Sequence, residues 1–279
     1  IKIRIKISSV LSEKQRVMDI FKSEQQINEW IQQGQILLAK KEIKKILLSK
    51  AFHKLNKNQN RKDTKGKLAT LDVTKVEFKS REFRCRLSNL CRRVGWTNES
   101  LQLLRDLFHP DTTLQPTIEE QLSYGASLAA IGIRSEAKQR LLKLLQSPSQ
   151  AIQSQVLLHL GLLEMSQWNY SGAKKYFLKL VKNTSTSSYQ KLIGFLNLGA
   201  CYSYSSQFAL AEKVLLKVYQ QAQKQNLKLI AINALEVLAQ GAFFQSNQTK
   251  AIEYLNILEP YLQIPKNTYQ CNSCNNKLS

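Results

Sequence analysis

Small and large apolar residues recur in a fixed order over residues 81–263. A small residue is followed twelve positions later by another small residue, and four positions further on by a large apolar one. This order predicts pairs of helices, in which the first small residue allows close approach, the second opens the partner helix, and the large residue fills the space between them. The five occurrences are Ser88–Ser100–Leu104, Gly125–Ala137–Leu141, Gly161–Ala173–Phe177, Gly199–Ala211–Leu215 and Ala239–Ala251–Leu255.

The repeat period predicts how such pairs are arranged. The second small residues are 37, 36, 38 and 40 positions apart. One helix pair cannot bury its apolar face alone, so units of this period must stack on one another. The sequence therefore predicts an all-α protein, built as an α-solenoid of stacked antiparallel helix pairs.

The segments "AKKYFLKL", "AEKVLLKV" and "AIEYLNIL" share the order Ala, three residues, then Phe or Leu. With the small–small–large order, they resemble tetratricopeptide repeats over about residues 81–263. The resemblance implies a right-handed solenoid with a concave groove lined by the first helix of each pair. The units here are longer than the usual period of about 34 residues, and most lack the proline that often closes a unit.

The regions outside the repeats are less regular. Residues 1–7 alternate between Ile and a basic residue, which predicts a short β-strand paired with residues 71–78 or with another chain. For residues 27–55 two interpretations remain open. One is a degenerate repeat with Gly34 as its small residue, a turn at "AKKE" and Ile46 in place of the second small residue; the other is a single continuous helix. The predicted division is 1–53 (strand plus helix or degenerate repeat), 54–80 (basic linker), 81–263 (five repeats) and 264–279 (polar tail).

Composition supports the helical prediction. The chain has only 10 Gly and 5 Pro, too few for the many turns of an all-β protein. It contains no run of about eighteen apolar residues, so no membrane span is predicted. Five Cys without disulfide spacing favour a reducing compartment, and we expect a cytoplasmic protein.

The net charge of +21 is concentrated in the first third of the chain, where residues 1–100 hold 24 Lys and Arg against 10 Asp and Glu. The lysine-rich stretch from residue 40 to 67 has two interpretations, a patch for an anionic partner or a solubilising surface. For the arginines on the first repeat helix we favour binding, since guanidinium groups suit carboxylate or phosphate. These are Arg81, Arg84, Arg86, Arg92 and Arg93.

The residues that usually carry catalysis or bind metals are scattered. His53, His109 and His159 lie in separate regions, and we interpret them as surface or packing residues. Cys271 and Cys274 have the spacing of half a zinc site but lack a second pair, so they are either part of a longer site or free thiols. No glycine-rich phosphate motif or Ser–His–acid set is present. We therefore predict no catalytic residue, no cofactor and no metal.

The resemblance places a set of partner-binding residues on the first helices. The predicted guest is an amphipathic or hydrophobic protein segment with an acidic end near the first-repeat arginines. The alternative is that the apolar positions are buried within the protein itself. The predicted function is an adaptor or scaffold that binds a partner protein; the alternative is a regulatory protein that binds nucleic acid through the basic N-terminal third. The predicted partner-binding residues are Asn89, Arg92, Arg93, Leu158, Leu162, Ile193, Tyr204, Asn233, Phe243 and Phe244.

Overall fold

The computed structural model describes residues 23–55 and 81–262, and within these ranges the secondary structure is entirely helical. The all-α prediction is therefore confirmed for this part of the chain. The predicted strand at residues 1–7, its suggested partner at 71–78, and the polar tail at 264–279 lie outside the described residues.

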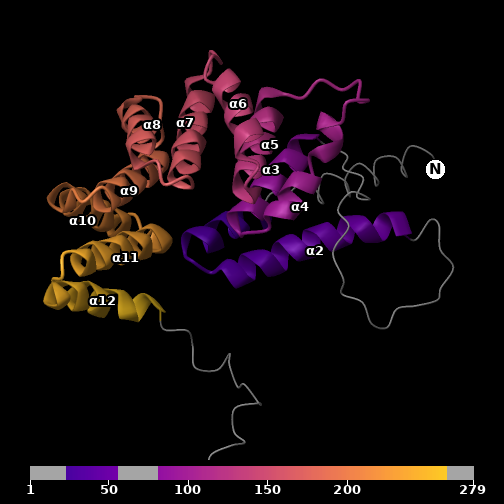
Figure 1. The fold of residues 1–279 in the computed structure, drawn as a ribbon. Helices are drawn as coiled ribbons and strands as arrows, with labels where there is room; N and C mark the ends of the chain where they lie inside the picture. Colours follow the sequence, from indigo (N-terminus) through magenta and orange to yellow (C-terminus); the bar gives the residue numbers. More distant parts are fainter. Residues whose placement is uncertain (1–22, 56–80, 263–279) are drawn as a thin grey trace, which may run out of the picture. The chain divides into compact units, whose positions relative to one another are not determined.

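Two compact units make up the chain, residues 1–194 and residues 195–279, and the division falls inside α9. Figure 1 shows the succession of helices in each unit. A first helix covers residues 23–32. The other helices are α2 (Ile36–Leu55), α3 (Arg81–Arg93), α4 (Thr97–Gln102), the short 3-10 helix η2 (Arg105–Phe108), α5 (Ile118–Ile131), α6 (Arg134–Leu144), α7 (Gln150–Met165), α8 (Tyr170–Lys182), α9 (Ser188–Tyr204), α10 (Phe208–Lys224), α11 (Lys228–Phe244) and α12 (Gln248–Leu262).

Each helix pair turns at a residue in the left-handed backbone conformation. For example, the N–H of Gly132 donates to Ala129 O (3.2 Å), and the N–H of Ile133 donates to Leu128 O (2.9 Å). This pair of bonds satisfies carbonyls at the end of the first helix and reverses the chain. The same two bonds occur at every such turn. The residues with positive φ at these turns are Gly34, Gly95, Gly132, Trp168, Ser206 and Ser246.

Three glycines on first helices allow their partner helices to approach closely, as the small-residue order predicts. A Cβ atom added to Gly161 would lie 2.5 Å from Phe177 Cε1, and one added to Gly199 would lie 2.6 Å from Leu215 Cγ. At Gly125 the corresponding distance, to Leu141 Cδ2, is 3.2 Å. In these three pairs the large residue therefore packs directly against the glycine backbone of its own pair.

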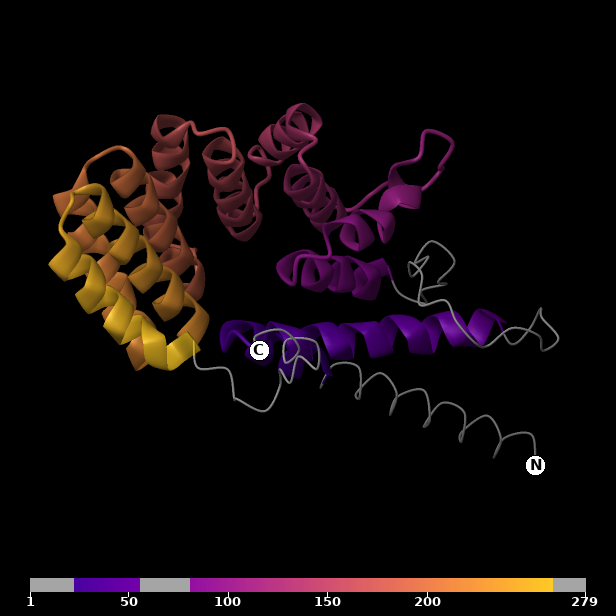
Figure 2. The same ribbon diagram turned by 60° about the horizontal axis from the view of Figure 1, so that its bottom comes forward.

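Within residues 1–194 the first helices of successive pairs pack side by side, with α5 in contact with both α3 and α7 (Figures 1 and 2). A buried cluster joins α5, α6 and α7 through Leu122, Leu141 and Val156. Apolar burial therefore holds neighbouring pairs together as well as the two helices of a pair.

The N-terminal region differs from both interpretations of the sequence. Gly34 has a φ of +75° and breaks the chain between residues 23–32 and α2, so the prediction of one continuous helix is wrong. The alternative turn at "AKKE" is also wrong, because those residues lie inside α2. Ile27, Ala39 and Ile43 are buried at the spacing of the small–small–large order, with Ile27 replacing the first small residue.

The fifth pair departs from the pattern at its large residue. Leu255 is 50% exposed, whereas Leu141, Phe177 and Leu215 are fully or almost fully buried. Tyr254 is buried instead, and its hydroxyl donates to Glu212 Oε1 (2.6 Å). The first helix of this pair carries Ala239 rather than glycine, but the first pair has Ser88 at this position and still buries Leu104, so the missing glycine alone does not explain the exposure of Leu255.

Candidate functional site

The predicted partner-binding residues fall in both units. In residues 1–194, Leu162 on α7 is exposed, and Leu158 on the same helix is half-buried together with Asn89, Arg92, Arg93 and Ile193. In residues 195–279, Asn233 is half-buried, whereas Tyr204, Phe243 and Phe244 are exposed. We therefore describe two candidate surfaces, one within each unit.

In residues 195–279 the exposed aromatic residues gather where α9 and α11 end, a surface we call the aromatic patch (Tyr204, Gln240, Phe243 and Phe244). Phe243 is 68% and Phe244 54% exposed. The rings of Tyr204 and Phe244 lie 6.4 Å apart, and the Tyr204 hydroxyl donates to Gln240 Oε1 (3.1 Å). Exposed aromatic residues next to one another are typical of interaction surfaces.

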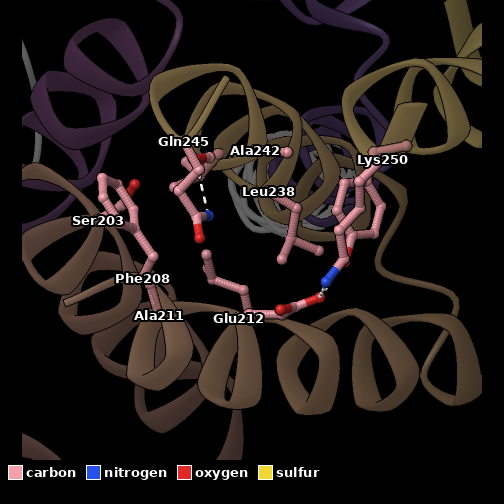
Figure 3. Close-up of a pocket in the computed structure, with 12 residues that line it drawn as sticks. Ser203, Phe208, Ala211, Glu212, Leu238, Ala242, Gln245 and Lys250 are labelled. Carbon is pink, nitrogen blue, oxygen red and sulfur yellow. Dashed lines mark hydrogen bonds and ion pairs between the residues drawn. The ribbon is translucent and has the colours of Figure 1, made fainter. Parts of the chain in front are cut away.

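A small cavity in the same unit lies between α10, α11 and α12 (Figure 3). At its edge Lys250 Nζ lies 2.5 Å from Glu212 Oε1. Hydrogen bonds from Lys250 and then Tyr254 lower the pKa of Glu212, so its carboxylate stays charged and paired. The cavity volume of about 10 Å³ has room for roughly one water molecule. This cavity is therefore too small for a substrate, and its ion pair joins α10 to α12.

Most arginines of the first-repeat group are held by partners within the chain. Arg81 Nη2 lies 2.5 Å from Glu120 Oε2 on α5, and Arg84 Nη1 lies 2.8 Å from Asp106 Oδ2. Arg86 Nε lies 3.3 Å from Glu24 Oε2 on the helix over residues 23–32. Arg93 donates to Asn28 Oδ1 on that helix. These four arginine side chains join α3 to neighbouring helices. The five arginines together therefore do not form an open anion-binding patch.

The carboxylate that holds Arg81 also belongs to the start of α5. The Thr117 hydroxyl accepts from Glu120 N (3.2 Å), and Glu120 Oε2 accepts from Thr117 N (2.8 Å), so the two residues form a capping box. Burial alone would raise the pKa of Glu120, but the bonds from Arg81 and Thr117 outweigh burial and lower it. This residue therefore joins α3 to α5 only while it is ionised.

Arg92 is the exception in the arginine group. Its Nη2 donates to Asn89 Oδ1 at 3.3 Å, its Nε is buried without a hydrogen-bond partner, and no carboxylate in the described part of the chain pairs with it. Burial, followed by the repulsion of Arg93, lowers the pKa of Arg92 to about 10. At neutral pH this guanidinium is still charged, and it lacks the carboxylate partner that Arg81, Arg84 and Arg86 have.

Buried hydroxyl groups hold Asn89 beside Arg92. Ser123 Oγ on α5 donates to Asn89 Oδ1 (3.0 Å), the same atom that accepts from Arg92. Behind it, Ser88 Oγ donates to Ser100 O (2.8 Å), and the hydroxyls of Ser100 and Ser127 lie 2.7 Å apart. The sequence pattern treats Ser88 and Ser100 as small packing residues, yet they also form a polar network that fixes the helices around Arg92.

His159 on α7 belongs to the same region. Burial and then the charge of Arg92 lower the pKa of His159 well below its ordinary value, so the imidazole is neutral at physiological pH. His159 lies two positions before Gly161, as Ser123 lies two positions before Gly125. We interpret the group of Asn89, Arg92, Ser123 and His159 as one site on α3, α5 and α7, and call it the Arg92 site. Sequence reasoning identified Arg92 but dismissed His159, although the shared repeat position with Ser123 was available as a signal.

The chemistry at other candidate positions is unreactive. Burial raises the pKa of Cys85 to about 11 and that of Cys91 to about 12, so neither thiol is ionised at neutral pH. No group of three or more His, Cys, Asp and Glu side chains in residues 23–55 and 81–262 is arranged to hold a metal ion. Cys271 and Cys274 lie outside these ranges. Among the helices that the structure describes, none is long and apolar enough to cross a membrane.

The chain matches no protein-family model, and a comparison with curated proteins finds no relative. The resemblance to tetratricopeptide repeats therefore depends on the residues themselves: the small–small–large order, the glycine contacts and the common turn geometry.

Proposed function

We propose that this chain is a non-catalytic interaction protein whose helix pairs stack as a right-handed, tetratricopeptide-like solenoid. Its role is that of an adaptor or scaffold in the cytoplasm. The Arg92 site holds an acidic group of a partner protein, either a side chain or a terminal carboxylate. The observation that carries the proposal is the half-buried Arg92, whose Nε is buried without a hydrogen-bond partner and whose guanidinium pairs with no carboxylate in the described part of the chain.

The energetics of Arg92 favour an anionic partner. Burying a charge without a compensating partner is costly, whereas a charge-assisted hydrogen bond to a carboxylate is among the strongest in proteins. Asn89 and Ser123 hold the guanidinium in place, so little ordering is needed when a partner binds. The neutral imidazole of His159 offers a hydrogen-bonding group on the facing α7 without adding charge.

The aromatic patch supports an apolar part of the same function in the second unit. Phe243 and Phe244 on α11 are exposed to water. Burying their rings against an apolar segment of a partner would be favourable. Both surfaces therefore favour a protein partner that offers acidic and hydrophobic residues.

Selection of random peptides on the purified full chain tests the Arg92 site. We expect the recovered peptides to be enriched in Asp and Glu or to require a free C-terminal carboxylate. Arg92→Met should weaken their binding by about 10- to 100-fold, because a hydrogen-bonded charge contributes roughly 1.5–3 kcal/mol. Arg134→Met, which removes an exposed arginine at the start of α6, is the matched control. Equal binding by the Arg92 variant and wild type would refute the assignment.

The aromatic patch has its own test. Phe243→Ala with Phe244→Ala should remove the binding of selected hydrophobic peptides while leaving thermal melting almost unchanged, since both side chains are exposed. Leu210→Ala removes an exposed apolar side chain on α10 of the same unit and should leave binding intact. Retained binding in the double variant would remove the patch from the proposed function.

A further inference from the structure

Trp168 stands in a backbone position that favours glycine. The six helix-pair turns carry glycine three times, serine twice and tryptophan once at the left-handed residue. A side chain there costs roughly 1–2 kcal/mol relative to the right-handed conformation. Trp168 has a φ of +60° and is 79% exposed, so burial of the indole does not offset this cost. A large aromatic side chain that is both strained and exposed indicates a role outside the fold.

A second ring lies next to Trp168, and a row of cations begins at Lys175, about 8 Å further along α8 than Tyr170 at 1.5 Å per residue. The ring of Tyr170, the first residue of α8, is edge-on to the indole with centroids 6.3 Å apart. Further along α8, Lys175, Lys179 and Lys182 are exposed and lie four and three positions apart, which places them on one face of the helix. From Lys175 to Lys182 this face is about 10 Å long at 1.5 Å per residue.

The carboxylate of Glu164 lies beside Gly172 at the start of α8, but it is paired with Lys138 and not with the lysine row. The sequence contains no Asp or Glu from residue 165 to residue 211, a stretch that includes all of α8. In the described parts of the chain, Lys175, Lys179 and Lys182 make no ion pair with a carboxylate. The lysine row therefore attracts an anion from outside the chain.

We propose that Trp168, Tyr170 and the lysine row of α8 form a binding site for single-stranded nucleic acid. Unpaired bases stack on exposed aromatic rings, while lysines along a groove or helix follow the phosphates. This surface is separate from the basic N-terminal third and from the Arg92 site. The outcome of its test does not affect the proposal of a protein partner.

The alternative of a membrane surface fits less well. A helix that lies in a membrane interface buries its apolar face among the lipids. The apolar face of α8 is already occupied, because Ala173, Phe177 and Leu180 are buried in the protein. Only the indole and the lysines would reach the lipid. A duplex fits less well too, because its bases are already stacked and present no face to the indole.

The test uses the full-length chain and fluorescein-labelled oligothymidylate, with binding followed by anisotropy at several salt concentrations. Trp168→Gly should weaken binding about 5- to 150-fold, because stacking contributes roughly 1–3 kcal/mol per base. Trp168→Tyr should retain most of the affinity. Trp168→Gly should also melt at a slightly higher temperature, which shows that the fold is intact. Replacing Lys175, Lys179 and Lys182 by Gln should reduce the salt slope by about 2, given about 0.7 per phosphate contact on a single strand.

The matched control is the replacement of Lys213, Lys217 and Lys224 on α10 by Gln, which removes the same charge elsewhere. In this control background, Trp168→Gly should weaken the binding of oligothymidylate by the same factor. Three outcomes overturn the proposal: oligothymidylate that binds the Trp168→Gly variant as well as wild type, duplex DNA that binds as tightly as the single strand, or indole emission that shifts with anionic vesicles but not with oligothymidylate.

Discussion

Replacing Arg92 by methionine should stabilise the unbound protein while removing its binding to acidic peptides. The substitution keeps an unbranched side chain on α3 and removes the buried charge. The ordinary arginine pKa of 12.5 falls to about 10 at this position. At 1.36 kcal/mol for each tenfold change, that difference corresponds to about 3 kcal/mol by which the environment disfavours the charged form. The lost bond to Asn89 offsets part of this, since a hydrogen bond to a charged group contributes roughly 1.5–3 kcal/mol.

The net expectation is a gain of about 1 kcal/mol in the free energy of unfolding, or roughly 2–4 °C in the melting temperature. A pH titration is a poor substitute. Because the folded-state pKa is depressed, the destabilisation is constant below pH 10 and disappears only as the pH rises toward 12.5. Thermal melting and urea unfolding of the Arg92→Met and Arg134→Met variants are therefore the assays. A loss of 1 kcal/mol or more in the Arg92 variant, with no change in the control, would show that Arg92 is satisfied within the chain and would refute the reasoning.

Three further predictions concern stability. Ser246→Gly should raise the free energy of unfolding by about 0.5–1 kcal/mol in urea, because it relieves the left-handed conformation at an exposed turn; a loss would contradict the turn assignment. Gly161→Ala should lower it by about 1–3 kcal/mol, because the added Cβ would lie 2.5 Å from Phe177, and Phe177→Leu in the same chain should restore part of the loss. The lowered pKa of Glu120 means that its contact with Arg81 stabilises the fold above pH 4.5 and is lost as the pH falls through the folded-state pKa. Melting from pH 7 to pH 3 should therefore show a smaller acid destabilisation in Glu120→Gln than in wild type.

Much of the fold follows from the sequence, because helix pairs need small residues where their backbones meet. Gly125, Gly161 and Gly199 mark these contacts directly. The N-terminal pair differs from the prediction because Gly34 has a positive φ and forms the turn, whereas the small-residue order predicts a packing contact there. Its spacing from Ile27 equals that of Gly95 from Ser88 and of Gly132 from Gly125, so the turn position was a second signal in the sequence. The order of residues does not show that Leu255 is exposed, because it does not report that its neighbour Tyr254 takes the buried position.

The candidate site was only partly predictable. The sequence places five arginines in one region but does not show which of them meet carboxylates, since Glu24, Asp106 and Glu120 come from other segments. The burial around Arg92 and its effect on the pKa of His159 arise from the packing of α3, α5 and α7, and the repeat position that His159 shares with Ser123 is the sequence signal for them. Trp168 lies seven positions after Gly161, so the sequence places it at a turn, whereas its left-handed backbone angle comes from the structure.

Photo-crosslinking from the Arg92 site in the native cell tests the central claim most directly. A photoreactive amino acid at Leu162, an exposed residue one turn along α7 from Leu158, would report what occupies the surface next to His159. We expect crosslinked peptides from a partner protein with carboxylates close to the attachment point, and we expect them to disappear when Arg92→Met is present in the same chain. Crosslinks that persist unchanged in the Arg92→Met background, or adducts to nucleic acid alone, would contradict the account.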